Sequence, residues 1–425
     1  MHLYLFTDKP SLCNVALIRP ASPAHLPPRG RLWGALLEIT YERTGFPMYH
    51  VKTMNKISKI GLAQLDDRFE ISDTMEHEDA ILVRSAKLHD YDFPAELLCI
   101  ARAGAGVNNI PLDRAADAGI VVFNTPGANA NGVKELTIAA LLLASRKISQ
   151  GITWVKEQSA AGADISAVVE KGKSAYVGPE IMGKTLGVVG LGAIGVLVAN
   201  AAAVLGMNIV GYDPFLSVKH ALNLTPGVEV VGTLDELYAK ADYITLHLPM
   251  TPDTKGTLNE AAFAAMKDGV RVVNLARGEL VDTAALKAAM DSGKCAAYVT
   301  DFPNSDTAAI EGVVAIPHLG ASTPESEDNC AMMAAREIKD YLDNGNIVNS
   351  VNLPVLSMPW AAKTRVCVIT KNADGAAVTA AVPAVASAFK ARGDYGYYIL
   401  DTDATVDAAA IAAIPGVLRV RVLSK

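Results

Sequence analysis

Hydrophobic and polar positions alternate in short runs along most of the chain, and the longest uncharged run extends from Thr185 to Tyr212. By hydropathy alone this run could cross a membrane, since a spanning helix needs about 20 consecutive apolar residues. Six glycines interrupt it, however, and two short β-leaning stretches, "TLGVV" and "MNIVGY", flank a helical "IGVLVANAAAVL". The pattern therefore predicts a strand, a turn, a helix and a second strand.

Regular alternation continues beyond Asp213. Strand-like runs "DYITLHL", "GVRVVNLA", "CAAYVT" and "GVVAIP" are separated by helical "LDELYAKA", "LNEAAFAAMK" and "TAALKAAMDSG". A long helix follows, with Ser322 and Thr323 as capping residues, Pro324 in its first turn and Gly345 past its end. Strands that alternate with helices predict an α/β fold with a parallel, doubly wound sheet.

The two ends of the chain differ from this middle part. After a linker at residues 351–362, residues 363–425 contain β runs "RVCVIT", "YGYYILD" and "GVLRVRVL" with Ala-rich stretches between them that we expect to be helical. Residues 1–47 are Pro-rich and aperiodic, and such sequence rarely packs into a core. We expect this segment to be a disordered extension or a stretch translated from a misassigned start, with Met48 as the true initiator.

Composition narrows the class of protein. A chain of 425 residues that is 51% apolar and 20% charged fits a soluble globular protein of two to four domains. A net charge of −7 without a long basic run disfavours nucleic acid as a partner. The five cysteines are scattered and lack C-x-x-C spacing, and the N-terminus has no secretory pattern. These features favour the cytoplasm, a reducing compartment, and no membrane partner.

Three glycines in the uncharged run form a G-x-G-x-x-G motif between the first strand and the helix: Gly190, Gly192 and Gly195. The first allows a tight turn, the second lets a pyrophosphate approach the backbone, and the third lets helix and strand pack closely. Asp213 ends the next strand, where a carboxylate accepts hydrogen bonds from ribose hydroxyls and repels a 2′-phosphate. The motif indicates NAD rather than NADP; the alternative is an ordinary Gly-rich turn of an α/β domain.

Polar residues also stand at or just past the ends of five successive predicted strands, where open α/β sheets bind ligands. Each alone could be a plain strand-end residue, but together they favour a site: Asp213, His247, Arg277, Asp301 and His318.

Two of these residues suit chemistry on a hydroxy acid. The planar guanidinium of Arg277 can grip an α-hydroxy or α-keto carboxylate through two hydrogen bonds, unless it forms a salt bridge to an acid such as Asp282. The imidazole of His318 can take a hydroxyl proton while hydride leaves the same carbon, unless it is a satisfied core histidine.

Several segments in order resemble one family: "VVGLGAIG", "YDP", "LHLPMT", "VRVVNLARGELVD" and "IPHLGAST", with "DAILVRSAKLHD" and "IARAGAGVNNIPLDRAADAGIVVFNTPGANANGVKELTIAALLLASR" upstream. They are similar to the D-isomer-specific 2-hydroxyacid dehydrogenases and most similar to the D-3-phosphoglycerate dehydrogenase branch, over residues 48–350. "RGDYGYYILDTD" and "IAAIPGVLRVRVL" resemble the C-terminal ACT domain of such enzymes.

The resemblance implies a Rossmann-type NAD-binding domain at residues 125–321, inserted in a flavodoxin-like substrate-binding domain at residues 48–124 and 322–350. A small α+β ACT-like domain would occupy residues 363–425. The implied site residues are as follows: Arg277 and His318 for catalysis; Gly190, Gly192, Ala193, Ile194, Gly195, Asp213, Leu248, Pro249, Leu275, Asp301 and Gly320 for the cofactor; Arg84, Ala105, Asn108 and Arg277, with Lys87 nearby, for the substrate; and no metal.

The sequence departs from the family at three places. The glutamate that orients the catalytic histidine is missing, and Asp306, in "DFPNSD", lies at the matching offset from Asp301. The effector-binding turn of the ACT-like unit is replaced by "NADGAAVTAAV", which argues against feedback by serine. Residues 1–47 have no counterpart.

The expected function is NAD-dependent oxidation of 3-phospho-D-glycerate to 3-phosphooxypyruvate, the first step of L-serine biosynthesis, by a cytoplasmic homodimer or homotetramer. One alternative is the same chemistry on another 2-hydroxy acid, such as glycerate or 2-hydroxyglutarate. The other is an NAD-sensing, corepressor-like binding protein, and a turnover assay would separate it from an enzyme.

Overall fold

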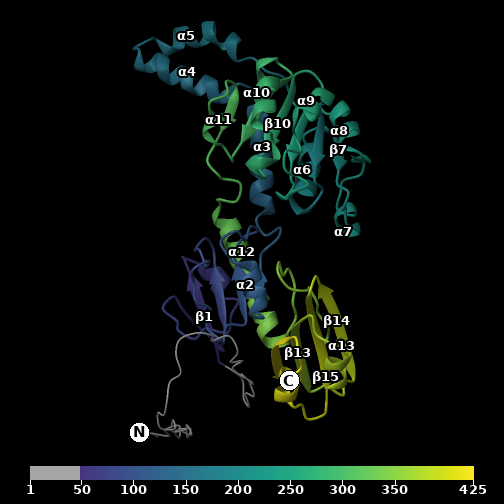
Figure 1. Ribbon diagram of the computed structural model, residues 1–425. Coiled ribbons are helices and arrows are strands. Elements are labelled where there is room, and N and C mark those ends of the chain that lie inside the picture. The colour runs from purple at the N-terminus through teal and green to yellow at the C-terminus, as the bar shows by residue number, and fades with distance from the viewer. Residues whose placement is uncertain (1–47) are drawn as a thin grey trace, which may run out of the picture. The chain divides into compact units, whose positions relative to one another are not determined.

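The computed structural model describes residues 48–425, which build three separate β-sheets (Figure 1). The expectation for residues 1–47 concerns a segment outside the described residues. Two sheets are parallel and the C-terminal one is antiparallel, which confirms the predicted fold class.

The first sheet has the order β2-β1-β3-β4-β5, with every strand parallel to its neighbours. This is the strand order of flavodoxin-like folds. Helix α12 joins it from far along the chain and packs on α1 and β4. The elements are β1 (Tyr49–Met54), α1 (Lys59–Leu62), β2 (Phe69–Ser72), β3 (Ala80–Val83), β4 (Cys99–Arg102), α2 (Leu112–Asp117), β5 (Val121–Phe123) and α12 (Pro324–Asn344).

The second sheet has the order β12-β11-β10-β9-β6-β7-β8 and is parallel throughout. The strand order reverses between β6 and β9, which is where such sheets bind ligands. The predicted strand, turn, helix and strand are β6 (Thr185–Val189), α6 (Ala193–Val204) and β7 (Asn208–Tyr212). The remaining strands are β8 (Glu229–Val230), β9 (Tyr243–Leu246), β10 (Val270–Asn274), β11 (Cys295–Thr300) and β12 (Val313–Ala315).

Helices cover both faces of the second sheet. One buried cluster joins it to α8, α9 and α10, and another joins it to α3 and α6. The helices are α3 (Ala130–Ser145), α7 (Val218–Ala221), α8 (Leu234–Lys240), α9 (Glu260–Ala265), α10 (Thr283–Asp291) and α11 (Ser305–Ala308), with a 3₁₀ turn at Gly278–Leu280.

Two helices between α3 and β6 pack mainly on each other: α4 (Ile148–Ala160) and α5 (Ile165–Gly172), followed by a 3₁₀ turn at Lys173–Tyr176. The ring of Trp154 lies 5.6 Å from that of Tyr176. Neither helix contains a buried residue.

The C-terminal sheet has the order β14-β15-β13-β16 and is antiparallel. Its elements are β13 (Thr364–Lys371), α13 (Gly375–Ala380), β14 (Ala386–Arg392), β15 (Tyr395–Thr402), α14 (Ala408–Ala412) and β16 (Val417–Ser424). The expectation that the stretch before β15 is helical is wrong at β14, which pairs with β15 along its whole length. The ring centres of Phe389 in β14 and Tyr398 in β15 lie 4.4 Å apart. This cross-strand packing overrides the helix propensity of the alanines of β14.

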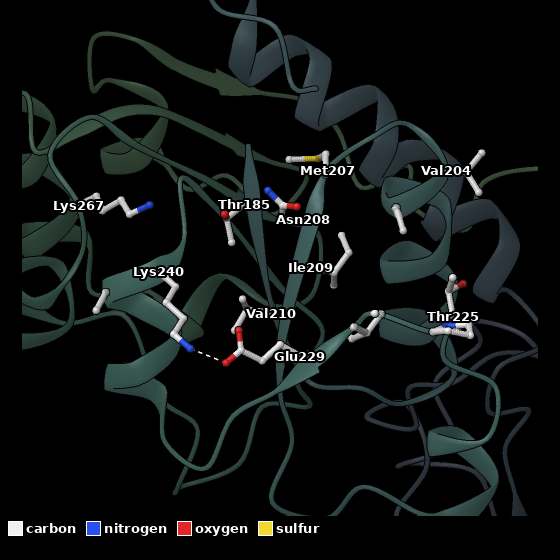
Figure 2. Close-up of a pocket in the computed structure, with 15 residues that line it drawn as sticks. Thr185, Val204, Met207, Asn208, Ile209, Val210, Thr225, Glu229, Lys240 and Lys267 are labelled. Atoms are coloured by element: carbon white, nitrogen blue, oxygen red, sulfur yellow. Dashed lines mark hydrogen bonds and ion pairs between the residues drawn. The ribbon is translucent and has the colours of Figure 1, made fainter. Parts of the chain in front are cut away.

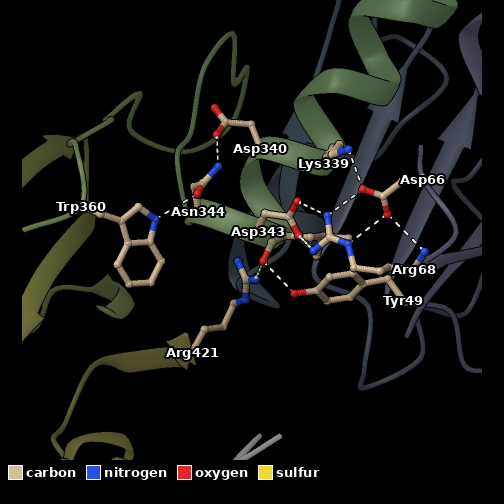
Figure 3. Close-up of polar contacts among 10 residues, drawn as sticks. Tyr49, Asp66, Arg68, Lys339, Asp340, Asp343, Asn344, Trp360 and Arg421 are labelled. Carbon is tan, nitrogen blue, oxygen red and sulfur yellow. Dashed lines mark hydrogen bonds and ion pairs between the residues drawn. The ribbon is translucent and has the colours of Figure 1, made fainter. Parts of the chain in front are cut away.

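The C-terminal sheet covers the end of α12 (Figure 3). Arg421, only 6% exposed, donates to the carbonyl oxygens of Tyr341 and Leu342 at 2.9 Å each. Arg365 donates to the carbonyl of Asn344 at 2.9 Å while it forms a buried two-point pair with Asp401. The last carbonyls of a helix have no partner within it, and cations suit its negative end. The sheet is therefore packed into the same core as the first sheet.

Three properties of residues 48–425 bear on the class of protein. No helix among them is both long enough and apolar enough to cross a bilayer. No group of three or more His, Cys, Asp and Glu side chains in this region could hold a metal ion. The cysteines of this region are buried free thiols: Cys99, Cys295, Cys330 and Cys367.

Candidate functional site

The glycine motif forms a turn that only small residues fit. A Cβ on Gly190, whose φ is +93°, would lie 2.5 Å from the carbonyl oxygen of His247. A Cβ on Gly195 would lie 1.9 Å from the carbonyl oxygen of Gly190. Gly192, by contrast, is the N-cap of α6 and has nothing within 4 Å of its Cβ position. Open space in front of a helix N-terminus, with the first-turn amides of Ala193 and Ile194, suits a pyrophosphate.

Asp213 lies directly after β7 and is fixed beside this turn. Its two carboxylate oxygens accept hydrogen bonds from the backbone amides of Leu191, at 2.9 Å, and Phe215, at 2.8 Å. Leu248, which with Pro249 follows β9, lies against the same turn, with its Cδ2 3.2 Å from the Cβ position of Gly190. The carboxylate is thus held where we expect the adenosine ribose.

Replacing Asp213 with Ala is expected to let NADP compete with NAD, because the charge that repels a 2′-phosphate is removed. The measurement is the ratio of kcat/KM for NAD to kcat/KM for NADP. Asp235→Ala, in the first turn of α8, is a matched control. An unchanged ratio in Asp213→Ala would contradict the placement of this residue at the ribose.

Asp301 directly follows β11 and is 1% exposed. Its Oδ2 accepts a hydrogen bond from the amide of Gly320 at 3.0 Å, and its Oδ1 is buried with no partner among the described residues. Burial raises the pKa of this carboxyl above its usual range. A buried acceptor of this kind calls for a donor, and the carboxamide of a nicotinamide is one. Together with the glycine turn, this residue fits NAD.

His247, which directly follows β9, has a structural role. Its Nε2 lies 3.1 Å from Oγ1 of Thr245, and burial lowers the pKa of its imidazole to about 4. An imidazole with so low a pKa is a weak base, so His247 is a poor candidate for taking up a hydroxyl proton near pH 7.

Arg277 is held by the end of β10. Asn274 donates to the carbonyl of Arg277 at 2.8 Å and accepts from its amide at 3.3 Å. The guanidinium lies 5.5 Å from the ring centre of Phe302. The alternative salt bridge to Asp282 is not formed, since that carboxylate caps α10 through the amide of Ala285. Nη1 of Arg277 donates to the carbonyl of Ala276 at 2.6 Å. The remaining N–H groups of the guanidinium stay available to a ligand.

The guanidinium of Arg277 faces the loop after β4. Two atoms lie close to the position that a Cβ on Gly106 would take. Nη2 of Arg277 is 3.5 Å from this position, and Oδ1 of Asn108 is 3.3 Å from the same position. The carbonyl of Ala105 accepts a hydrogen bond from Asn124 at 2.7 Å, which fixes the loop. The structure therefore brings Arg277 together with the predicted substrate residues Ala105 and Asn108.

Two further arginines belong to this region. Arg84 forms an ion pair with Glu327 of α12 at 2.6 Å. Arg102, at the end of β4, donates through Nε to the carbonyl of Arg84 at 3.0 Å. Burial and the neighbouring charges of Arg84 and Arg277 lower the pKa of Arg102. Sequence reasoning missed Arg102, although its position at the end of a buried strand was a signal.

His318 and Asp306 are not brought together. His318 follows β12 and is exposed, and its ring centre lies 4.3 Å from that of Phe302. Asp306 is exposed in α11, which is capped by Asn304, and no hydrogen bond or ion pair joins Asp306 to His318. The carboxylate that interacts electrostatically with His318 is that of Asp301. This interaction lowers the pKa of Asp301, against the larger effect of burial. The role of Asp306 stays a prediction.

A separate hollow opens at the opposite edge of the second sheet (Figure 2). Thr185 and Asn208, the first residues of β6 and β7, line it. Its charged residues are already paired, Lys240 with Glu229 and Lys267 with Asp242. This hollow lies away from the carboxyl ends of the strands and from every candidate residue of the site.

One family of dehydrogenases matches the nucleotide-binding part of the chain. Residues 138–320 match the family described as "D-isomer specific 2-hydroxyacid dehydrogenase, NAD binding domain". Residues 138–320 are thus similar to the NAD-binding domain of the D-isomer-specific 2-hydroxyacid dehydrogenases, which confirms the predicted resemblance to this family and the predicted cofactor.

Particular relatives are D-3-phosphoglycerate dehydrogenases. That of Bacillus subtilis is 36% identical over 337 residues, which cover 75% of this chain and 62% of the relative. That of Mycobacterium tuberculosis is 40% identical over 296 residues, 68% of this chain and 53% of the relative. The chain therefore spans somewhat more than half the length of these relatives.

Solved structures agree with the fold. The NAD⁺-bound 3-phosphoglycerate dehydrogenase of Entamoeba histolytica is 26% identical with a TM-score of 0.55, covering 72% of this chain and 99% of the other. A glyoxylate reductase from Paecilomyes thermophila is 27% identical with a TM-score of 0.59, covering 72% and 98%.

Proposed function

We propose that the protein is an NAD-dependent dehydrogenase that oxidises 3-phospho-D-glycerate to 3-phosphooxypyruvate, the entry to L-serine biosynthesis. The observation that carries the proposal is the grouping of Arg84, Arg102 and Arg277 around the loop after β4. Glu327 pairs with one of these three charges, that of Arg84. Like charges repel, so the group is stabilised by a further anion, and a phosphorylated hydroxy acid offers both a carboxylate and a phosphate. The D-3-phosphoglycerate dehydrogenases among its relatives support this choice of substrate.

Each residue has a defined part in the proposed reaction. NAD, when bound, supplies the acceptor for the hydride from C2. His318 takes the hydroxyl proton, and Arg277 holds the carboxylate and stabilises the charge that develops on the carbonyl oxygen. Free amides at Ala105 and Gly106 are further donors for the carboxylate, since no hydrogen bond among residues 48–425 uses them. Arg84 and Arg102 hold the phosphate.

The proposal extends to the setting of the reaction. The substrate is a small anionic 2-hydroxy acid, the enzyme is a cytoplasmic homodimer or homotetramer, and neither nucleic acid nor membrane takes part. The net charge of −7 and the lack of a basic run support the absence of a nucleic-acid partner. Light scattering of the purified protein measures the oligomeric state.

The Arg84→Ala variant tests the choice of substrate. A charge-assisted hydrogen bond contributes about 1.5–3 kcal/mol, so kcat/KM for phosphoglycerate should fall roughly 10- to 100-fold, and that for glycerate should change little. Arg336→Ala is a matched control, since this exposed arginine of α12 donates a hydrogen bond to Gln64, away from the loop after β4. Equal losses with both substrates would favour the alternative of an unphosphorylated 2-hydroxy acid.

A further inference from the structure

The ring of Phe302 lies against both candidate catalytic side chains. Its centre is 4.3 Å from the centre of the His318 imidazole, with the planes tilted by 46°. It is also 5.5 Å from the guanidinium carbon of Arg277. Phe302 is therefore placed to set the two side chains relative to each other.

The backbone on both sides of these contacts is fixed. The amide of Phe302 donates to Oγ1 of Thr300 at 3.0 Å, and Thr300 is fully buried at the end of β11. A Cβ on Gly278 would lie 3.2 Å from the carbonyl oxygen of Phe302, so the turn after β10 packs closely on it. The carbonyl of His318 accepts from Ser322 at 3.3 Å. With the backbone held, the rotation of the imidazole is the freedom that remains.

Nothing polar fixes that rotation among residues 48–425. The ring of His318 has no hydrogen bond to another residue there, and no carboxylate lies within ion-pairing distance of it. Asp306 is exposed in α11, and no hydrogen bond or ion pair joins it to the ring. Orientation of the imidazole must then come from packing, and the neighbouring ring is that of Phe302.

We propose that Phe302 is a positioning residue that orients His318 for proton transfer and Arg277 for the carboxylate, in place of a carboxylate partner of the histidine. The inference rests on the proposed dehydrogenase function. A misoriented base slows the chemical step, because proton transfer requires the acceptor within hydrogen-bonding reach of the hydroxyl. A misplaced Arg277 weakens substrate binding but leaves the dinucleotide turn untouched.

The test compares Phe302→Leu with Phe302→Tyr. Leucine removes the ring, so kcat should fall about 10-fold or more and KM for the hydroxy acid should rise, while KM for NAD is unchanged. Tyrosine keeps the ring and should restore kcat to within about threefold of wild type. Phe389→Leu is the matched control, because Phe389 stacks on Tyr398 at 4.4 Å in the C-terminal sheet. That variant should keep wild-type kinetics.

A second measurement reports on the contact without turnover. The NMR signal of the His318 Cε1 proton, assigned by its loss in His318→Gln, is shifted by the ring current of Phe302. It should move in Phe302→Leu and stay in place in Phe389→Leu. Wild-type kcat in Phe302→Leu, or an unmoved His318 signal, would overturn the inference. A wild-type protein inactive on every 2-hydroxy acid would overturn the proposed function instead, and the NMR comparison would still decide the contact.

Discussion

His318→Ala is expected to lower kcat at least about 100-fold and to leave the affinity for NADH nearly unchanged. The imidazole is exposed at the carboxyl ends of the strands of the second sheet, where it interacts with Asp301. It packs on the ring of Phe302, which also lies against Arg277. Its removal takes away the proposed proton acceptor but leaves the glycine turn and Asp213 in place. Steady-state kinetics measure kcat, and NADH fluorescence titration measures affinity.

The control for this variant is His89→Ala. His89 is exposed in the loop after β3 and lies outside the site, so its removal should leave kcat within about twofold of wild type. A His318→Ala protein that keeps half of the wild-type kcat would show that another group accepts the proton.

Arg421→Met is expected to lower the free energy of unfolding by about 3–5 kcal/mol. The substitution removes two charge-assisted hydrogen bonds, to the carbonyls of Tyr341 and Leu342, which contribute about 1.5–3 kcal/mol each. Each carbonyl keeps one other donor, the amide of Gly345 and the hydroxyl of Tyr49 respectively. It also removes a cation from the negative end of α12, which contributes up to about 2 kcal/mol. Urea denaturation, followed by circular dichroism, measures the change.

Arg392→Met serves as the comparison for Arg421. Arg392 is exposed on the edge strand β14 and donates to one carbonyl, that of Ser350, at 3.2 Å. Its replacement should cost less than about 1 kcal/mol. If the two variants were equally stable, the C-terminal sheet would be a loosely attached module and not a part of the core that holds α12.

The nucleotide-binding half of the fold was predictable because its signals are local. Gly190 and Gly195 mark the turn by a positive φ and by close approaches that only glycine allows, and Gly192 leaves open space before α6. The strands on either side are short apolar runs with β-branched residues, and Asp213 follows the second directly. Period, glycine spacing and a strand-end carboxylate are all visible in the sequence.

The errors arose where tertiary contacts decide the outcome. The alanines around residues 386–392 favour a helix, and only pairing with β15 makes them a strand. The sequence also could not indicate that Arg421 and Arg365 are buried, because the carbonyls they bind belong to α12, far away along the chain. Burial of a charge depends on a partner that sequence neighbours do not reveal.

The candidate site was only partly predictable, because strand-end positions are visible in the sequence but contacts between loops are not. Arg277 and His318 stand at strand ends, and the fold rule places such residues at one edge. Arg102 was missed, since its nearness to Arg84 and Arg277 follows from packing between the loops. Asp306 was chosen by sequence offset; it is exposed in α11, no hydrogen bond or ion pair joins it to His318, and its role stays a prediction.

The most direct test of the central claim is NADH formation by the purified protein with NAD and a panel of 2-hydroxy acids. The account predicts turnover of 3-phospho-D-glycerate with kcat on the order of 1–10 s⁻¹, within the usual range for enzymes. It also predicts that kcat/KM for this substrate exceeds those for glycerate and 2-hydroxyglutarate by at least about 10-fold, which corresponds to one charge-assisted contact with the phosphate. A higher kcat/KM for an unphosphorylated acid, or no NADH with any of them, would contradict it.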